Sequence, residues 1–338
     1  MNNWAEFRHF KYLLAIMEHG GLRAAAEQLR TAESNLSVQA KQFQEYFTIE
    51  LFRKARDGHI LLTETGIAFK PIAQGLLDAR DEAIAALKAI ERGQIRTLRI
   101  GCTPFVDPEL FEMACALHKE ILPSCPIRPT HGDAVQLVEE LVAGEIDAAI
   151  MTLPISDPRL SKEALRQDRL VACLRADDPL AGKAAILPPD LESNLGVLRH
   201  PRQHPEAHSR LLALLEEAGV QLKEFSRASN PVEMQSLVKA GCGLALLREG
   251  TVLAAGLTTR PIAGVNWTVE TAFVYNKQLH PKTIPVLARN LKRRLATQPV
   301  KGRSSEAMDD RSPRSGSAKH PPRPERSGQG EYPRWRRA

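Results

Sequence analysis

The stretch from Leu22 to Gln44 constrains the fold more than any other part of the chain. It reads LRAAAEQLRTAESNLSVQAKQFQ, and its apolar residues recur at helical spacing in two separate runs. The runs are interrupted at residues 30–32, where the apolar period fails. Two short helices joined by a tight turn are typical of a helix-turn-helix. The apolar residues of the two runs are Leu22, Ala25, Ala26 and Leu29, then Leu36, Ala40 and Phe43.

The second of these helices is expected to have a polar outer face. Its outward positions hold hydroxyl, amide and ammonium side chains, which read base edges or hold phosphates. Taken alone, the same pattern also fits an ordinary helical hairpin, so the flanking sequence has to decide. The outward polar residues are Ser34, Asn35, Ser37, Gln39 and Lys41.

The flanks favour a DNA-binding module. Upstream, Phe7, Phe10, Leu14 and Met17 recur at helical spacing, which predicts a first helix behind the pair. Downstream, Asp57-Gly58 is a tight-turn signal between two short strand-like runs. The cations of this hairpin would contact phosphates beside the second helix, and such contacts fix the register in which a helix reads bases. These cations are Arg53, Lys54 and Arg56.

Residues 7–66 resemble the winged helix-turn-helix of the LysR-type transcriptional regulators, and the resemblance continues to about residue 295. The matching pieces are AAAEQL, NLSVQAKQF and LFRKARDGHILLTETG, in that order and spacing. The resemblance implies binding of double-stranded DNA and of a small-molecule effector, with RNA polymerase as a further partner. It also implies a homodimer or tetramer.

The N-terminal winged helix-turn-helix, residues 1–66, is called the head below. Its sequence departs from the family pattern at two places. Ala32, Glu33 and Ser34 stand where the family usually has Ser-Gln-Pro or Ser-Gln-Ser, and Val38 follows Ser37 where Arg or Lys is usual. Residues 1–66 hold eight cations and eight anions, which is modest for binding a polyanion. We therefore expect weak DNA binding by one head and a need for dimerisation. The alternative is a small-molecule binding protein with a weakened or degenerate DNA-binding head. Glu33 and Val38 complete the set of candidate DNA contacts.

Residues 67–95 are expected to form a linker helix between this head, residues 1–66, and the rest of the chain. Pro71 is expected to bend the helix near its start. A long helix with an apolar seam usually packs on a copy of itself, which favours a dimer. The alternative is that the seam packs on the chain's own effector domain. The seam consists of Ile67, Ile72, Leu76, Ala83, Leu87 and Ile90.

Residues 96–295 alternate between strand-like and helical runs, which predicts an α/β effector domain. The predicted strands and helices divide into two lobes, one at about 97–165 with 268–295 and one at about 166–267. The chain would cross twice between these two lobes. This arrangement resembles that of the periplasmic binding proteins. The expected fold class is therefore an N-terminal winged helix-turn-helix, a long linker helix and a two-lobed α/β domain.

A ligand is expected in the cleft between the lobes. Hydroxyls and helix N-termini that follow parallel strands suit a carboxylate or another small anion. Each candidate could instead be a plain turn, capping or solvated-loop residue. No cofactor is implied, and Pro201 and Pro205 argue against a metal site at His200, His204 and His208. The candidate ligand contacts are Thr103, Thr152, Arg199, His200, Ser229 and Asn230.

The remaining sequence limits the other functions. No run of about 18 apolar residues exists, so no membrane span is expected, and no catalytic motif indicates an enzyme. Five cysteines without a CxxC pair suggest buried thiols in a reducing cytoplasm, with a redox switch at Cys102 or Cys242 as the weaker alternative. Residues 296–338 hold ten cations and five anions, so most of the net charge of +6 lies there. This basic tail is expected to be disordered.

Overall fold

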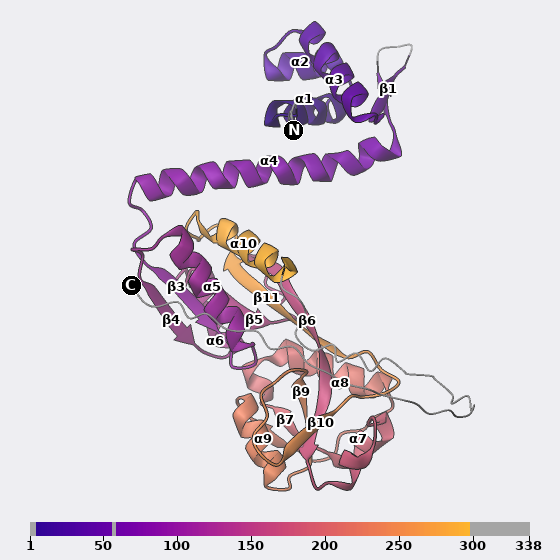
Figure 1. The fold of residues 1–338 in the computed structure, drawn as a ribbon, viewed down its shortest axis with the longest axis vertical. Helices are drawn as coiled ribbons and strands as arrows, with labels where there is room; N and C mark the ends of the chain where they lie inside the picture. The colour runs from indigo at the N-terminus through magenta and orange to yellow at the C-terminus, as the bar shows by residue number, and fades with distance from the viewer. Residues whose placement is uncertain (1–4, 56–58, 298–338) are drawn as a thin grey trace, which may run out of the picture. The chain divides into compact units, whose positions relative to one another are not determined.

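The computed structural model describes residues 5–55 and 59–297 (Figure 1). The predicted Asp57-Gly58 turn, Arg56 and the tail from residue 298 lie outside the described residues. The head contains three helices and a two-stranded antiparallel wing in which Phe52 pairs with Leu62. Its elements are α1 (Phe7–Glu18), α2 (Leu22–Leu29), α3 (Glu33–Phe47), β1 (Phe52–Lys54) and β2 (Ile60–Leu62).

The predicted helix-turn-helix is confirmed. Leu36, Ala40 and Phe43 are buried and form the inner face of α3, which packs in one cluster with α1 and α2. Arg30 ends α2 in the left-handed conformation at φ 53°, and its N–H group bonds to the Ala26 carbonyl. This sharp reversal lets α3 begin only three residues later.

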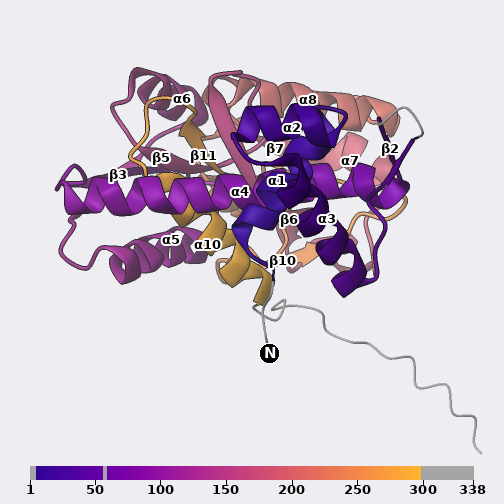
Figure 2. The same cartoon turned by 90° about the horizontal axis from the view of Figure 1, so that it is seen from above.

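A single long helix, α4 (Glu64–Glu91), follows the wing (Figure 2). Thr63 caps it by accepting a hydrogen bond from Gly66 N at 3.0 Å. A Cβ atom at Gly66 would lie 1.9 Å from the Leu51 carbonyl oxygen, so only glycine permits this close approach. Phe69 and Ala73 join the core of the head. The first part of α4 is therefore fixed to the winged helix-turn-helix.

The predicted apolar seam of α4 faces solvent within one chain. Ile72 and Leu87 are 65% and 67% exposed, and Leu76 is 37% exposed. With the exposed Ala83 they lie at spacings of four, seven and four residues, which places them along one side of the helix. An apolar row of this kind is typical of a helix that packs on a partner.

The rest of the described chain forms two α/β lobes that share one path of paired strands. The strands run in the order β4-β3-β5-β11-β6-β9-β7-β8, and β10 pairs with β6. Strands β4, β3 and β5 are parallel, as predicted for the first lobe. The elements of the first lobe are β3 (Leu98–Cys102), α5 (Pro108–Ile121), β4 (Ile127–His131), α6 (Ala134–Ala143), β5 (Ala148–Thr152), β11 (Thr268–Asn276) and α10 (Ile284–Thr297).

The second lobe begins within β6 (Leu160–Arg175), one strand that belongs to both lobes (Figure 1). Residues 160–169 pair with β11, and residues 170–175 pair with β9 and β10. The other elements of this lobe are η1 (Pro179–Gly182), α7 (Pro188–Asn194), β7 (Leu195–Arg199), η2 (Pro201–Gln203), α8 (Pro205–Glu217), β8 (Ser226–Ala228), α9 (Pro231–Lys239), β9 (Leu244–Arg248) and β10 (Leu257–Arg260).

A buried carboxylate joins the central strands of the first lobe. The Asp147 side chain is 3% exposed and pairs with Arg99, whose Nη2 atom donates to it at 2.6 Å. The backbone N–H group of Arg99 donates to the same carboxylate at 2.7 Å. Asp147 thereby holds the start of β5 against β3. Thr103 is the residue that directly follows β3.

Candidate DNA-binding surface and effector cleft

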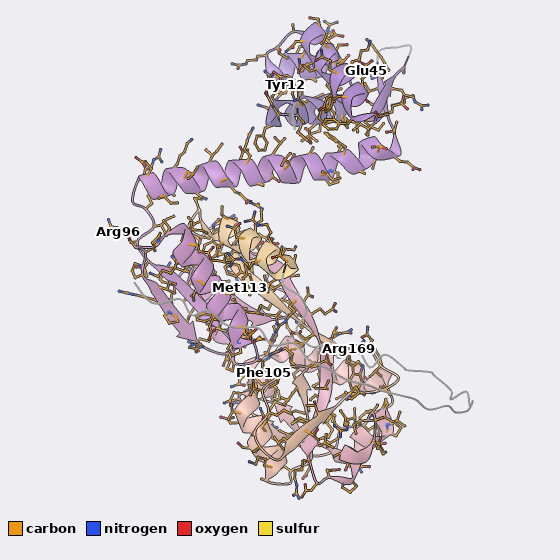
Figure 3. The ribbon with its side chains drawn as sticks, in the orientation of Figure 1. Tyr12, Glu45, Arg96, Phe105, Met113 and Arg169 are labelled. Carbon is orange, nitrogen blue, oxygen red and sulfur yellow. The ribbon has the colours of Figure 1, made fainter. Side chains whose placement is uncertain are left out.

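The outer face of α3 carries a continuous row of exposed side chains. Ser34, Val38, Lys41 and Glu45 lie at i, i+4, i+7 and i+11, opposite the buried inner face. Lys41 Nζ lies 3.7 Å from the Glu45 carboxylate, and Figure 3 labels Glu45 on this helix. Glu33 and Ser37 are also exposed. This face can therefore present hydroxyl, apolar and charged groups to the major groove.

Two of the expected base-reading side chains make contacts inside the head. His9 Nδ1 accepts from Glu6 N at 2.9 Å, so His9 Nε2 donates to the Gln39 Oε1 atom at 2.8 Å. The Asn35 side chain donates to Thr31 Oγ1 at 3.2 Å. Gln39 ties α3 to α1, and Asn35 ties α3 to the turn before it. The sequence pattern shows neither contact because the donor or acceptor lies on another element.

Two of the three predicted wing cations, Arg53 and Lys54, lie among the described residues, and both are exposed. Arg53 forms a two-pronged ion pair with Glu50, with N–O distances of 2.9 and 2.7 Å. The hydrogen bond from Arg53 lowers the pKa of Glu50. Lys54 is exposed on β1. A phosphate would have to compete with Glu50 for Arg53 and with the more distant Glu45 for Lys41.

A cavity of about 140 Å³ lies between the two lobes. Apolar side chains provide most of its wall, and Phe105 (labelled in Figure 3) comes from the first lobe. Thr152 of the first lobe and Arg199 and Arg248 of the second provide polar groups. Since the cavity lies where β5 and β7 end, it matches the expected position of the cleft. The second lobe contributes Leu170, Leu198, Leu211, Leu214, Met234 and Leu246 to the wall.

Arg199 reaches from β7 across to the first lobe. Its Nη1 atom donates to Thr152 Oγ1 at 3.2 Å, and its guanidinium lies 4.2 Å from the centre of the Phe105 ring. Its Nε atom is buried without a hydrogen-bond partner among the described residues. Burial lowers the pKa of Arg199 to about 10, and the charge of Asp133 opposes this shift. A largely buried cation whose donors are not all used is well suited to an anionic ligand.

The other expected ligand contacts do not line this cavity. Thr103 is 1% exposed, and its Oγ1 atom lacks a hydrogen-bond partner among the described residues. His200 caps η2 by accepting from Arg202 N. Ser229 N donates to the Glu233 carboxylate at 2.7 Å, and the Asn230 side chain accepts from Glu233 N at 2.9 Å, so this pair starts α9. Only Thr152 and Arg199 of the six candidates border the cavity.

The structure adds bonds between the lobes that sequence reasoning missed. His204 Nδ1 caps α8, so its Nε2–H group donates to the Thr152 carbonyl at 2.8 Å. The Glu206 carboxylate accepts from both the N–H and the hydroxyl of Ser156. The position of His204 before Pro205 predicts a helix start, but nothing in the sequence indicates its partner in the other lobe.

Arg248 of the cavity wall belongs to a cluster of four charged side chains. Arg166 pairs with Asp107 at 2.7 Å and with Asp168 at 2.9 Å. Arg248, which lines the cavity, lies 3.4 Å from Asp107 and 3.8 Å from Asp168. The four charges of this cluster balance. Arg199 and Arg210 are the arginines of the cavity wall that form no such ion pair among the described residues, and Arg199 is the more buried of the two.

The buried thiols of the effector domain are expected to react slowly. Burial raises the pKa of Cys102 to about 12 and that of Cys173 to about 11, whereas Cys242 is exposed. Because the thiolate is the reactive form, iodoacetamide at pH 8 should label Cys242 first in the native protein. Peptide mass spectrometry would measure the labelling rates, with Cys242→Ser as the control. Fast labelling of Cys102 would contradict this expectation and support a redox role there.

Comparison with known proteins agrees with this arrangement. Residues 7–67 match the family described as bacterial regulatory helix-turn-helix protein, lysR family. Residues 91–296, more than half of the chain, match the LysR substrate binding domain. The chain belongs to the LysR family. It is thus a ligand-responsive, DNA-binding transcription regulator of the kind that this family comprises.

Individual LysR-family proteins resemble the chain over most of its length. The RuBisCO operon transcriptional regulator of Acidithiobacillus ferrooxidans is 27% identical over 74% of this chain and 80% of its own. The regulator BenM of Acinetobacter baylyi is 27% identical over 73% of this chain and 81% of its own. The crystal structure of full-length CbnR complexed with its target DNA has a TM-score of 0.51 and 19% identity, covering 86% of this chain and all of CbnR. That likeness confirms the fold class.

No helix among residues 5–55 and 59–297 is long and apolar enough to cross a membrane.

Proposed function

We propose that this LysR-family protein is a cytoplasmic regulator without catalytic activity of its own, which pairs two heads on a pseudo-palindromic DNA site. The exposed outer face of α3 carries the proposal, because its inner face is fully used in the core of the head. Ser34, Ser37, Val38 and Lys41 face the bases or nearby phosphates, and the wing contacts the backbone. Glu33 at the start of α3 can accept from cytosine N4. RNA polymerase is a further partner.

The effector is proposed to be a small anion held in the cavity between the lobes. Arg199 supplies the cation and Thr152 a hydroxyl, while the apolar wall encloses the rest of the ligand. Thr103, His200, Ser229 and Asn230 support the surrounding turns and helix starts. An effector that binds one arrangement of the lobes better than another would shift the protein toward that arrangement. This shift would alter how the paired heads meet DNA.

DNA binding is tested by a gel shift with the full-length protein on its own upstream DNA, at low and moderate salt. The double variant Lys41→Ala, Arg53→Ala should bind at least about tenfold more weakly and show a smaller salt dependence, since two phosphate contacts are lost. A matched control is Lys239→Ala, Arg202→Ala, which removes two exposed cations from the effector domain. A well-folded dimer with no specific shift at low salt would instead support a ligand-binding protein with a degenerate head.

The role of Arg199 is tested by the substitution Arg199→Met. In the absence of ligand, the variant should be more stable to unfolding by roughly 1 kcal/mol, because a buried and incompletely paired cation is removed. It should also lose any rise in melting temperature that a panel of small carboxylates produces in the wild type. Arg202→Met, at an exposed position outside the cavity wall, should change neither property. Carboxylate stabilisation that survives in Arg199→Met would place the anion elsewhere.

A further inference from the structure

Val38 is an exposed apolar side chain in the middle of a polar helix face. It is 50% exposed, and within residues 33–45 of α3, all of which the structure describes, it is the one large apolar side chain exposed by more than a third. The exposed positions around it hold serine, asparagine, glutamine, lysine and glutamate. An isolated exposed valine contributes nothing to the core of the head, so its position suggests a contact outside the chain.

The neighbours of Val38 leave it at the centre of the DNA-facing row. Gln39 turns toward α1 to bond His9, and Asn35 bonds back to Thr31. Lys41 pairs with Glu45, one turn further from the start of the helix. Glu33, Ser34, Ser37 and Val38 are exposed over the first two turns of the helix, and Val38 is the one apolar side chain among these four. These turns are the part of a recognition helix that contacts base edges.

The major groove offers a partner of matching chemistry. Of the groups that base pairs display there, the thymine 5-methyl group is the apolar one. A valine in a helix has one strongly preferred rotamer, so its two methyl groups lose little freedom when they pack against another surface. Arginine or lysine at this position would instead seek guanine or phosphate.

On the basis of the proposed DNA binding, we propose that Val38 is a specificity-determining residue that packs on the 5-methyl group of one thymine in each half-site. The chain then selects a T·A pair at that position through an apolar contact. The contact needs no charge, which suits a head whose cations and anions are equal in number. Removing the buried methyl group of this thymine should lower the affinity for DNA about fourfold.

The test removes the methyl group from the DNA and the side chain from the protein in turn. Full-length protein first selects its site from a random duplex library, and each thymine of that site is then replaced by deoxyuridine. The wild type should bind about fourfold more weakly when the critical thymine of one half-site loses its methyl group. Val38→Ala, which keeps the helix, should respond to that replacement by less than twofold. Val38→Ile is the control that keeps the wild-type response.

The outcomes separate this inference from the proposed function. Equal losses for the wild type and Val38→Ala on the deoxyuridine duplex would overturn the role of Val38 while leaving DNA recognition intact. Wild-type binding that ignores deoxyuridine at every thymine would overturn it as well. Failure to select any DNA sequence would refute the proposed function, and the role of Val38 with it.

Discussion

The double substitution Ile72→Glu, Leu87→Glu is expected to convert the protein to a monomer whose affinity for its operator falls at least about 100-fold. The two side chains are 65% and 67% exposed on α4 and lie in the same apolar row. Two glutamates per helix would place four like charges in a packed seam, where each would lose its water. A single head would then bind alone, and the gain from linking two heads, about 10² to 10⁴ in affinity, would be lost.

Sedimentation equilibrium and gel shifts would measure both effects on the same preparations. Val232→Glu is a matched control, because Val232 is 71% exposed but lies on α9 of the effector domain. Circular dichroism should show the helix content of the wild type in both variants. If the double variant stays dimeric at micromolar concentration, the seam of α4 does not hold the dimer together.

Asp147→Ala is expected to reduce the free energy of unfolding by about 1–3 kcal/mol, as is typical when a buried hydrogen-bond donor loses its partner. The substitution would leave the backbone N–H group of Arg99 without its buried acceptor, and it would unpair a guanidinium whose side chain is 42% exposed. It would also loosen the start of β5 in the middle of the first sheet. Urea unfolding followed by circular dichroism would measure the loss.

A paired substitution distinguishes the lost ion pair from lost packing. Arg99→Met, Asp147→Leu removes both charges and should recover much of the stability, since replacing an ion pair by apolar groups is often neutral. Asp157→Ala is a control at another aspartate that pairs with arginine, because that pair is on the surface and should contribute less than about 1 kcal/mol. A loss from Asp147→Ala no larger than that from Asp157→Ala would show that the buried pair is not important for folding.

The head could be predicted from sequence because its signals are local. The helical spacing of the apolar residues within 22–44 predicts which sides of α2 and α3 are buried. Those sides form the observed core. The hydrogen-bond partner of each polar side chain could not be predicted in the same way. Gln39 has the chemistry of a base reader, but a buried histidine on another helix binds it.

The effector domain shows where local signals fail. Residues 160–169 read LSKEALRQDR, which is rich in good helix formers, and pairing with β11 nevertheless makes them a strand. The place of Arg199 at the end of a strand makes it a candidate ligand contact from sequence alone. Its burial was not predictable, because Phe105 and Thr152 come from the other lobe and meet it only when the lobes are in contact. The same holds for the balanced charges around Arg248.

The bonds that converge on Thr152 and Ser156 affect how tightly an effector can be held. In the described arrangement, Thr152 accepts from Arg199 and His204, and the Glu206 carboxylate accepts from Ser156. A ligand too large for the existing cavity could enter only when those bonds are broken, that is, in a minor open population. Its apparent affinity would fall by the fraction of molecules that are open. The threshold concentration at which the cell senses the effector is therefore set partly by contacts that the effector never touches.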